Sequence, residues 1–194
     1  TEEEFVELRA RLFEAEVAYN PAQLAELLER PPLAADVSGW WRTVPASQQY
    51  AFIGAAPRVV GNLEGVPYAV RNAANRKVLT EELAAIDERL GGLLGRAERD
   101  ELEARQHMLE HVRTALDGDS HVRRLVALDP TGAGRAVIAV GDVSTAGFVS
   151  YLVPGMFFGV DAQIDAWADT AETLVADQER WLDRLRPGTE ETVA

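Results

Sequence analysis

The sequence predicts a chain in two parts: an all-helical arm over residues 1–118 and the opening strands of an α/β sheet over residues 119–194. Two observations support this division. Before residue 118, apolar residues recur at steps of three to four, which is the period of an amphipathic helix. After His121, short apolar runs alternate with turn residues, and one long helical pattern follows them.

Two helices are expected at the start of the arm. Thr1 and Glu4 have the spacing of a capping box, and apolar residues follow at helical spacing up to residue 15. Asn20 can cap a second helix because Pro21 suits the first helical position. The proline pair at 31–32 ends this second helix.

Aromatic side chains gather in the next part of the arm, and a short helix is expected over residues 47–56. Trp40, Trp41, Tyr50 and Phe52 could form a wall on which a ligand stacks. Such clusters are more often the core of a small helical unit, because large rings bury much apolar surface. We therefore expect these four rings to pack together.

Two longer helices complete the arm. A turn-rich loop at 61–67 leads into a helix from Pro67 to about Leu90, which a pair of glycines then breaks. A charged helix is expected from about Ala97 to Leu116.

The second part is expected to begin with a hairpin of strands 124–129 and 135–141, because a Gly-rich turn separates two apolar runs. A third strand is expected at 148–153, followed by a helix from 161 to about 186. Thr192 and Val193 would then begin another strand.

Composition excludes several classes of function. The chain has no cysteine, so it holds no disulfide, thiolate nucleophile or sulfur-ligated metal. Its net charge of −13 repels phosphate backbones, so nucleic acid is not expected as a partner. No run approaches the ~20 apolar residues of a membrane span. No signal peptide is recognisable, and the sequence is compatible with a cytoplasmic or a secreted location. We expect no cofactor.

Two segments carry a family resemblance. One is Gly61-Asn-Leu-Glu-Gly-Val-Pro67 running into Arg71-Asn-Ala-Ala-Asn-Arg76, and the other passes from Leu128-Asp-Pro through Val140-Gly-Asp142 to Leu152-Val-Pro-Gly155. Together they resemble an actinobacterial α/β-hydrolase family formerly catalogued as a domain of unknown function. The similarity extends from about Trp40 to the C-terminus.

The resemblance implies a fold and an activity. The fold would be a partial α/β-hydrolase sheet, with its first three strands and first helix, preceded by the all-helical arm. The activity would be that of a serine-type hydrolase that cleaves an ester or amide bond of an acyl or other small-molecule substrate. In that family the nucleophile lies in a Gly-x-Ser-x-Gly elbow, which this chain lacks, since Ser144 has no glycine two residues before it.

The chain is therefore expected to be the N-terminal portion of such an enzyme and catalytically incomplete by itself. In the strand order that the resemblance implies, a fourth strand lies between the second and the third. The remainder of the same protein, or a second chain, would supply that strand and the nucleophile.

By the same resemblance, the loop after the third strand would donate a backbone N–H to the oxyanion hole. Met156 is the expected donor, and Gly155 would allow the close approach of the backbone. The alternative is that this Pro-Gly dipeptide only turns the chain from strand to helix.

A second motif, His107-Met-Leu-Glu-His111, matches the H-x-x-E-H pattern of some zinc peptidases. Two histidines four residues apart share a helix face and can bind one zinc ion. A third ligand is needed, for which only Glu172 or Glu179 can be suggested. The flanking residues indicate a solvated helix, so we expect no metal at this pair.

Other polar residues are expected to have structural roles. Arg71, Asn72 and Asn75 would bond to the backbone of the neighbouring loop, and Asp142 would cap the turn that follows its strand. If the whole chain were structural in this sense, it would be a non-catalytic helical interaction module, which is the principal alternative to the hydrolase. The zinc peptidase is a third and weaker alternative.

Overall fold

The structure is a computed structural model of the whole chain, and it describes residues 32–118, 120–153, 160–189 and 191–194. The two helices expected before residue 31 lie outside the described residues. By its internal contacts the chain divides into two compact units, Thr1–Val78 and Leu79–Ala194.

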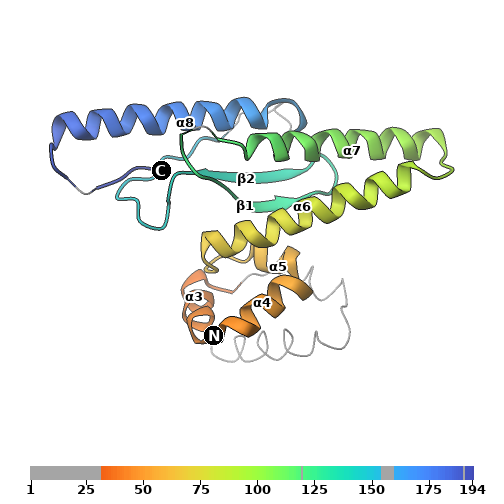
Figure 1. Cartoon of the computed structure of the whole chain (residues 1–194), viewed down its shortest axis with the longest axis horizontal. Coiled ribbons are helices and arrows are strands. Elements are labelled where there is room, and N and C mark those ends of the chain that lie inside the picture. The colour runs from red at the N-terminus through yellow and green to blue at the C-terminus, as the bar shows by residue number, and fades with distance from the viewer. Residues whose placement is uncertain (1–31, 119, 154–159, 190) are drawn as a thin grey trace. The chain divides into compact units, whose positions relative to one another are not determined.

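In the first unit the described elements are α3 (Ala34–Thr43), α4 (Ala46–Ala55), α5 (Pro57–Asn62) and the first half of α6 (Tyr68–Leu90) (Figure 1). Prolines separate the short helices, because α4 starts directly after Pro45 and α5 has Pro57 in its first turn. The expected helices at 47–56 and 67–90 are confirmed as α4 and α6. Helices α3 and α5 were not predicted from the sequence.

Large aromatic side chains form the core of this unit. Trp40 and Trp41 meet edge to face with ring centroids 5.7 Å apart, and Trp40 lies 5.8 Å from Phe52. All three are buried with Val37, Val60 and Leu63. The prediction that Tyr50 joins them is wrong, since this side chain is 76% exposed. Two residues along a helix turn the side chain by about 200°, so Tyr50 and Phe52 point to opposite sides of α4.

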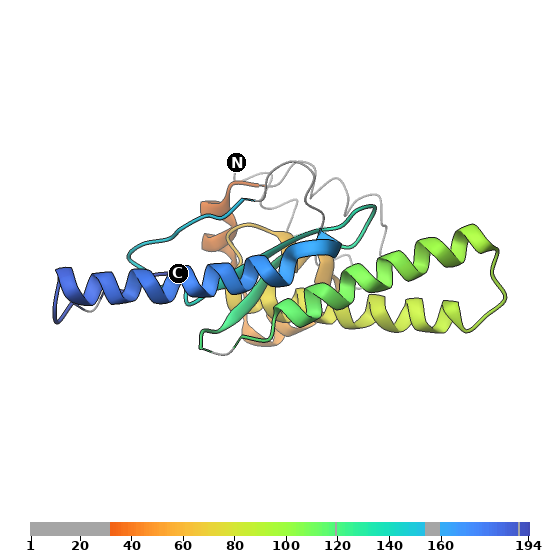
Figure 2. The ribbon, with the colours of Figure 1, turned by 90° about the horizontal axis from the view of Figure 1, so that it is seen from above.

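The second unit begins with the rest of α6, which returns as α7 (Arg96–Ala115) (Figures 1 and 2). The two helices run antiparallel, and ion pairs such as Arg89–Glu98 at 2.6 Å and Arg105–Glu82 join them. Helix α8 (Val160–Leu185) packs against α7. The expected helices near 97–116 and 161–186 are thus confirmed.

A two-stranded antiparallel hairpin pairs β1 (Arg123–Asp129) with β2 (Arg135–Val140). The pairing is irregular between Leu125 and Ala127. The connecting turn uses Gly132 and Gly134, both at positive φ. On one face of β2, Ile138 and Val140 pack with Val175 and Leu182 of α8 and with Val193. The expected hairpin is confirmed.

The predicted fold class, a partial α/β-hydrolase sheet with three strands, is wrong for the described residues. These are mostly helical and contain only the two-stranded sheet β1–β2. Residues 148–153 form no strand and make one isolated parallel bridge, between Phe148 and Val193. An apolar run becomes a strand only where a neighbour supplies a ladder of hydrogen bonds. The neighbour here is three residues long, and beyond it Tyr151 and Val153 are exposed.

Candidate functional site

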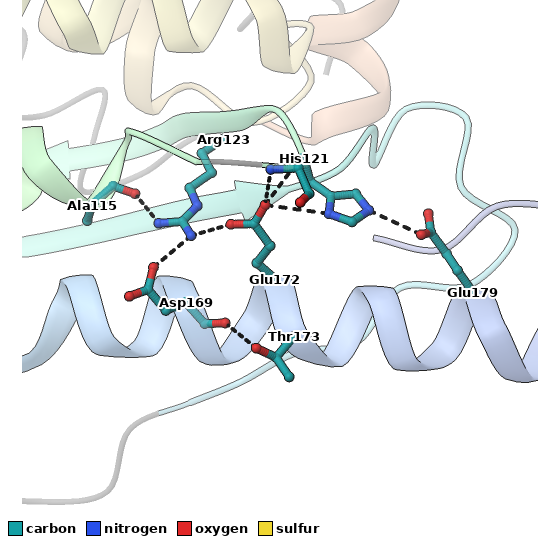
Figure 3. A network of polar contacts seen from close by, with 8 residues as sticks. Ala115, His121, Arg123, Asp169, Glu172, Thr173 and Glu179 are labelled. Carbon is teal, nitrogen blue, oxygen red and sulfur yellow. Dashed lines mark hydrogen bonds and ion pairs between the residues drawn. The ribbon is translucent and has the colours of Figure 1, made fainter.

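Charged side chains gather where β1 begins and α8 passes beside it (Figure 3). Arg123 lies at the centre of this cluster and is only 5% exposed. Its guanidinium donates to the carbonyl oxygen of Ala115 at 3.1 Å, to Oδ1 of Asp169 at 2.7 Å, and to Oε2 of Glu172. A buried guanidinium needs such acceptors, because a buried charge that lacks a hydrogen-bond partner is destabilising.

The carboxylate of Glu172 connects this arginine to the chain that leads into β1. Its Oε1 accepts the backbone N–H of Ser120 at 2.7 Å and that of His121 at 2.8 Å. Burial by itself raises the pKa of the Glu172 carboxyl, but the hydrogen bonds from Arg123, Ser120 and His121 outweigh it and lower the pKa to about 2. The group is therefore ionised at any ordinary pH.

His121 lies between two carboxylates of α8. Its Nε2 is 3.2 Å from Oε2 of Glu179, and its Nδ1 is 3.6 Å from Oε1 of Glu172. Such an acid-flanked imidazole could move a proton, but catalysis of acyl transfer also needs a nucleophile within its reach. Among the described residues, no serine or threonine hydroxyl bonds to the His121 ring, and the Thr173 hydroxyl donates instead to the Asp169 carbonyl oxygen. As far as the described residues show, the network joins α7, β1 and α8 and contains no nucleophile.

The sequence analysis missed this network. The signal was present in two places: Arg123 and Arg124 alternate across β1, and α8 carries acidic residues at helical spacing on one side. Only Arg123 is directed toward α8, while Arg124 donates to the carbonyl oxygen of Gly141 at 2.9 Å.

The residues of the expected oxyanion-hole loop, the donor Met156 and its neighbour Gly155, lie outside the described residues. The chain before them is described only to Val153, and there Ser150 accepts a hydrogen bond from Nε2 of Gln178 on α8 at 2.8 Å. The oxyanion role of the two residues stays a prediction.

The histidine pair of the H-x-x-E-H motif lies on α7. The His107 and His111 rings have centroids 4.5 Å apart, and Nδ1 of His111 is 3.3 Å from Oδ2 of Asp165 on α8. Glu172 and Glu179, suggested as third ligands, lie instead beside His121. Within the described part of the chain no group of three or more histidine and acidic side chains is placed to hold a metal ion.

The Arg-Asn-Ala-Ala-Asn-Arg segment holds the loop that precedes it. Nε of Arg71 and Nδ2 of Asn75 both donate to the carbonyl oxygen of Gly61, at 3.2 and 2.8 Å. Arg71 also pairs with Glu64 at 2.9 Å. The expectation that these two side chains bind backbone of the 61–67 segment is confirmed, although Gly61 lies in the last turn of α5 and not in a loop. Asn72 differs, since its Oδ1 accepts from Nε of Arg76 on the same exposed helix face at 3.1 Å.

Asp142 caps the turn after β2, as expected. Its Oδ1 accepts the N–H of Ser144 at 3.1 Å, and its carbonyl oxygen accepts the N–H of Thr145 and that of Ala146.

Elsewhere a shallow notch of about 190 Å³ lies on α8, lined by Asp177, Arg180, Trp181 and Arg184. None of these residues belongs to the Arg123 network. No described helix combines the length and the hydropathy that crossing a bilayer requires.

Comparison with known proteins gives two mycobacterial relatives. The chain is 30% identical over 162 residues to the uncharacterized proteins MT2140 and Rv2079 of Mycobacterium tuberculosis, from strains CDC 1551 / Oshkosh and H37Rv. The match covers 70% of this chain and 24% of each relative, so the chain spans about a quarter of the length of the curated relatives it matches. No family model matches, and no solved structure gives a significant match.

Proposed function

We propose that this chain is the non-catalytic N-terminal portion of a longer serine-type hydrolase that cleaves an ester or amide bond of an acyl or other small-molecule substrate. The nucleophile, acid and histidine would lie on other residues of that longer protein. The proposal draws its chemistry from the resemblance of the two quoted segments. The length of the two mycobacterial relatives supports it, because both extend well beyond the matched region.

One structural observation bears on the partner of this chain. The N–H groups of Gly147 and Phe148 donate to the Thr192 carbonyl oxygen, at 2.9 and 3.3 Å. The Ala194 N–H donates to Phe148 at 3.1 Å, and the Ser150 N–H donates to Ala194 at 3.0 Å. Residues 192–194 thus make a short parallel pairing with residues 147–150.

The surroundings of residues 192–194 extend the same observation. Val193 and Ala194 are buried, and a Cβ at Gly141, just after β2, would lie 3.2 Å from the Val193 carbonyl oxygen. The segment therefore lies between the end of β2 and Phe148. An extended segment that continued along this line could pair with both sides. We infer that another segment of the longer protein occupies this edge and is the principal partner of the chain.

The alternative is a helical interaction module with no link to hydrolysis. It is favoured by the Arg123 network, which among the described residues joins α7, β1 and α8 without a nucleophile.

A covalent probe separates the two functions. The longer protein and residues 1–194 alone would each be treated with a fluorophosphonate, which reacts with activated serines. We expect one labelled serine in the longer protein, within a Gly-x-Ser-x-Gly sequence, and no labelling of residues 1–194. Replacing the labelled serine with alanine should abolish the signal. A longer protein that stays unlabelled would exclude the hydrolase and leave the interaction module.

A further inference from the structure

Helix α8 carries a line of carboxylates on one face. Asp165, Asp169, Glu172 and Glu179 follow one another at steps of four, three and seven residues, which places them on one side of a helix. We call them the acidic stripe. Each is within ion-pair distance of an arginine or a histidine side chain from another part of the second unit.

Three basic side chains meet the acidic stripe, and two of them are histidines. Arg123 of β1 meets Asp169 and Glu172. His111 of α7 meets Asp165 at 3.3 Å. His121 lies between Glu172 and Glu179, at 3.6 and 3.2 Å, as Figure 3 shows. The chain has three histidines, and the third, His107, is exposed beside His111.

The protonation state of these rings decides whether the contacts attract. A protonated imidazole donates from both nitrogens, whereas a neutral one must direct a lone pair outward from one of them. At His121, Nε2 can donate to Oε2 of Glu179 at 3.2 Å, whereas Nδ1 lies 3.6 Å from Oε1 of Glu172 and makes no hydrogen bond, so protonation of the ring adds an electrostatic attraction to both carboxylates. Of the four carboxylates, Asp169 and Glu172 meet the guanidinium of Arg123. Among the described residues, the basic side chain within ion-pair distance of Asp165 is His111, and that of Glu179 is His121.

We propose that the acidic stripe and the two histidines form a pH-responsive latch: protonated His111 and His121 hold α8 against α7 and the start of β1, and loss of their protons loosens α8. Histidine as a residue type changes its charge between about pH 5 and pH 8, so the latch is tested over that range. The Glu172 carboxylate, with a pKa of about 2, keeps its charge over that range. Burial acts to raise the pKa of Asp165, but hydrogen bonds from the Ala166 N–H and from His111 lower it.

Release of α8 would have a defined structural consequence. Val175 of α8 is buried with Val140 of β2 and with Val193, and Ala171 and Leu182 pack against this cluster. The latch would therefore control access to an apolar surface at the end of β2.

The test is amide hydrogen exchange of α8 peptides in the full chain at low micromolar concentration, at about pH 6 and about pH 8, corrected for the intrinsic effect of pH on exchange. We expect the protection of α8 to fall roughly three- to tenfold at the higher pH. The double variant His111→Gln/His121→Gln should show the weaker protection at both pH values. His107→Gln, which removes the exposed histidine, should behave as the wild type.

A second variant covers the case in which the double histidine variant does not fold. Asp165→Asn/Glu179→Gln removes the carboxylates that Arg123 does not use, and it should abolish the pH dependence equally. The latch is excluded if wild-type α8 is equally protected at both pH values. It is also excluded if a folded double variant keeps the wild-type dependence on pH.

Discussion

Single residues fix the loop between α5 and α6. Gly61 offers its carbonyl oxygen to Arg71 and Asn75, and its own Cα lies against the Asn75 side chain. Arg71 and Asn75 are almost fully buried, so their polar atoms depend on these contacts. The requirement for glycine here is one of space, because a Cβ would overlap the Asn75 amide.

Substitution at this position should therefore be costly. Gly61→Ala is expected to destabilise the first unit by about 1–3 kcal/mol, because a buried amide must move to admit one methyl group. Gly39→Ala and Gly54→Ala are matched controls, since nothing lies within 4 Å of a Cβ at either helical site. Both should stabilise by roughly 0.5–1 kcal/mol. Urea unfolding followed by tryptophan fluorescence gives the comparison, and equal effects at all three sites would contradict the overlap.

The Glu172 carboxylate leads to a prediction for acid. Its folded pKa of about 2 lies below the ordinary value of 4.5, so its stabilisation is present above about pH 4.5 and disappears as the pH falls toward 2. At neutral pH, Glu172→Gln should cost about 3 kcal/mol at most, since the side chain is largely buried.

Urea unfolding from about pH 7 to about pH 3 measures the difference between wild type and this variant, which should shrink toward the acid end. Asp183→Asn, on an exposed part of α8, should change stability by no more than roughly 0.5 kcal/mol. A difference for Glu172→Gln that stays constant over the whole range would contradict the assignment.

At the scale of elements, helix α7 is stabilised mainly by one apolar face. Met108, Leu109 and Val112 are buried, while most of the remaining α7 surface is charged. A helix with such a low overall hydropathy is stabilised mainly by packing of its apolar face. The sequence analysis expected this helix but described it only as solvated.

Leu109→Ala should accordingly destabilise the second unit by about 3–5 kcal/mol, because Leu109 is 0% exposed and its removal leaves a cavity. Leu93→Ala deletes the same atoms from a side chain that is 100% exposed, and it should change stability by less than roughly 0.5 kcal/mol. Thermal unfolding by circular dichroism tests the pair. Similar losses for both variants would mean that α7 does not contribute its buried face to the core.

At the scale of the whole molecule, the exposed apolar residues near the Phe148–Val193 bridge bear on association with another chain. Phe148, Val149, Tyr151 and Val153 are 47%, 39%, 85% and 81% exposed, and they follow closely in sequence. A run of exposed apolar residues beside unpaired backbone favours association with another chain.

Residues 1–194 by themselves should therefore self-associate as their concentration rises, which light scattering after gel filtration can detect. Tyr151→Ser/Val153→Ser should reduce that association, whereas Tyr50→Ser, at an exposed site in the first unit, should not. A soluble monomer with one sharp unfolding transition at high concentration would argue against the proposed incomplete edge.

The local elements could be largely predicted from the sequence. Helical period and turn residues placed α4, α6, α7 and α8 within a residue or two, and a Gly-rich turn between apolar runs identified the hairpin. The structural roles of Arg71, Asn75 and Asp142 were also within reach, because each acts on backbone close to it in sequence.

Tertiary structure decided what depends on distant neighbours. Residues 148–153 have the pattern of a strand, yet a strand needs a partner, and only Thr192–Ala194 pairs with it among the described residues. The Arg123 network escaped prediction for the same reason. Its acids lie more than 40 residues away in sequence, and only the packing of α8 beside β1 brings them to the guanidinium.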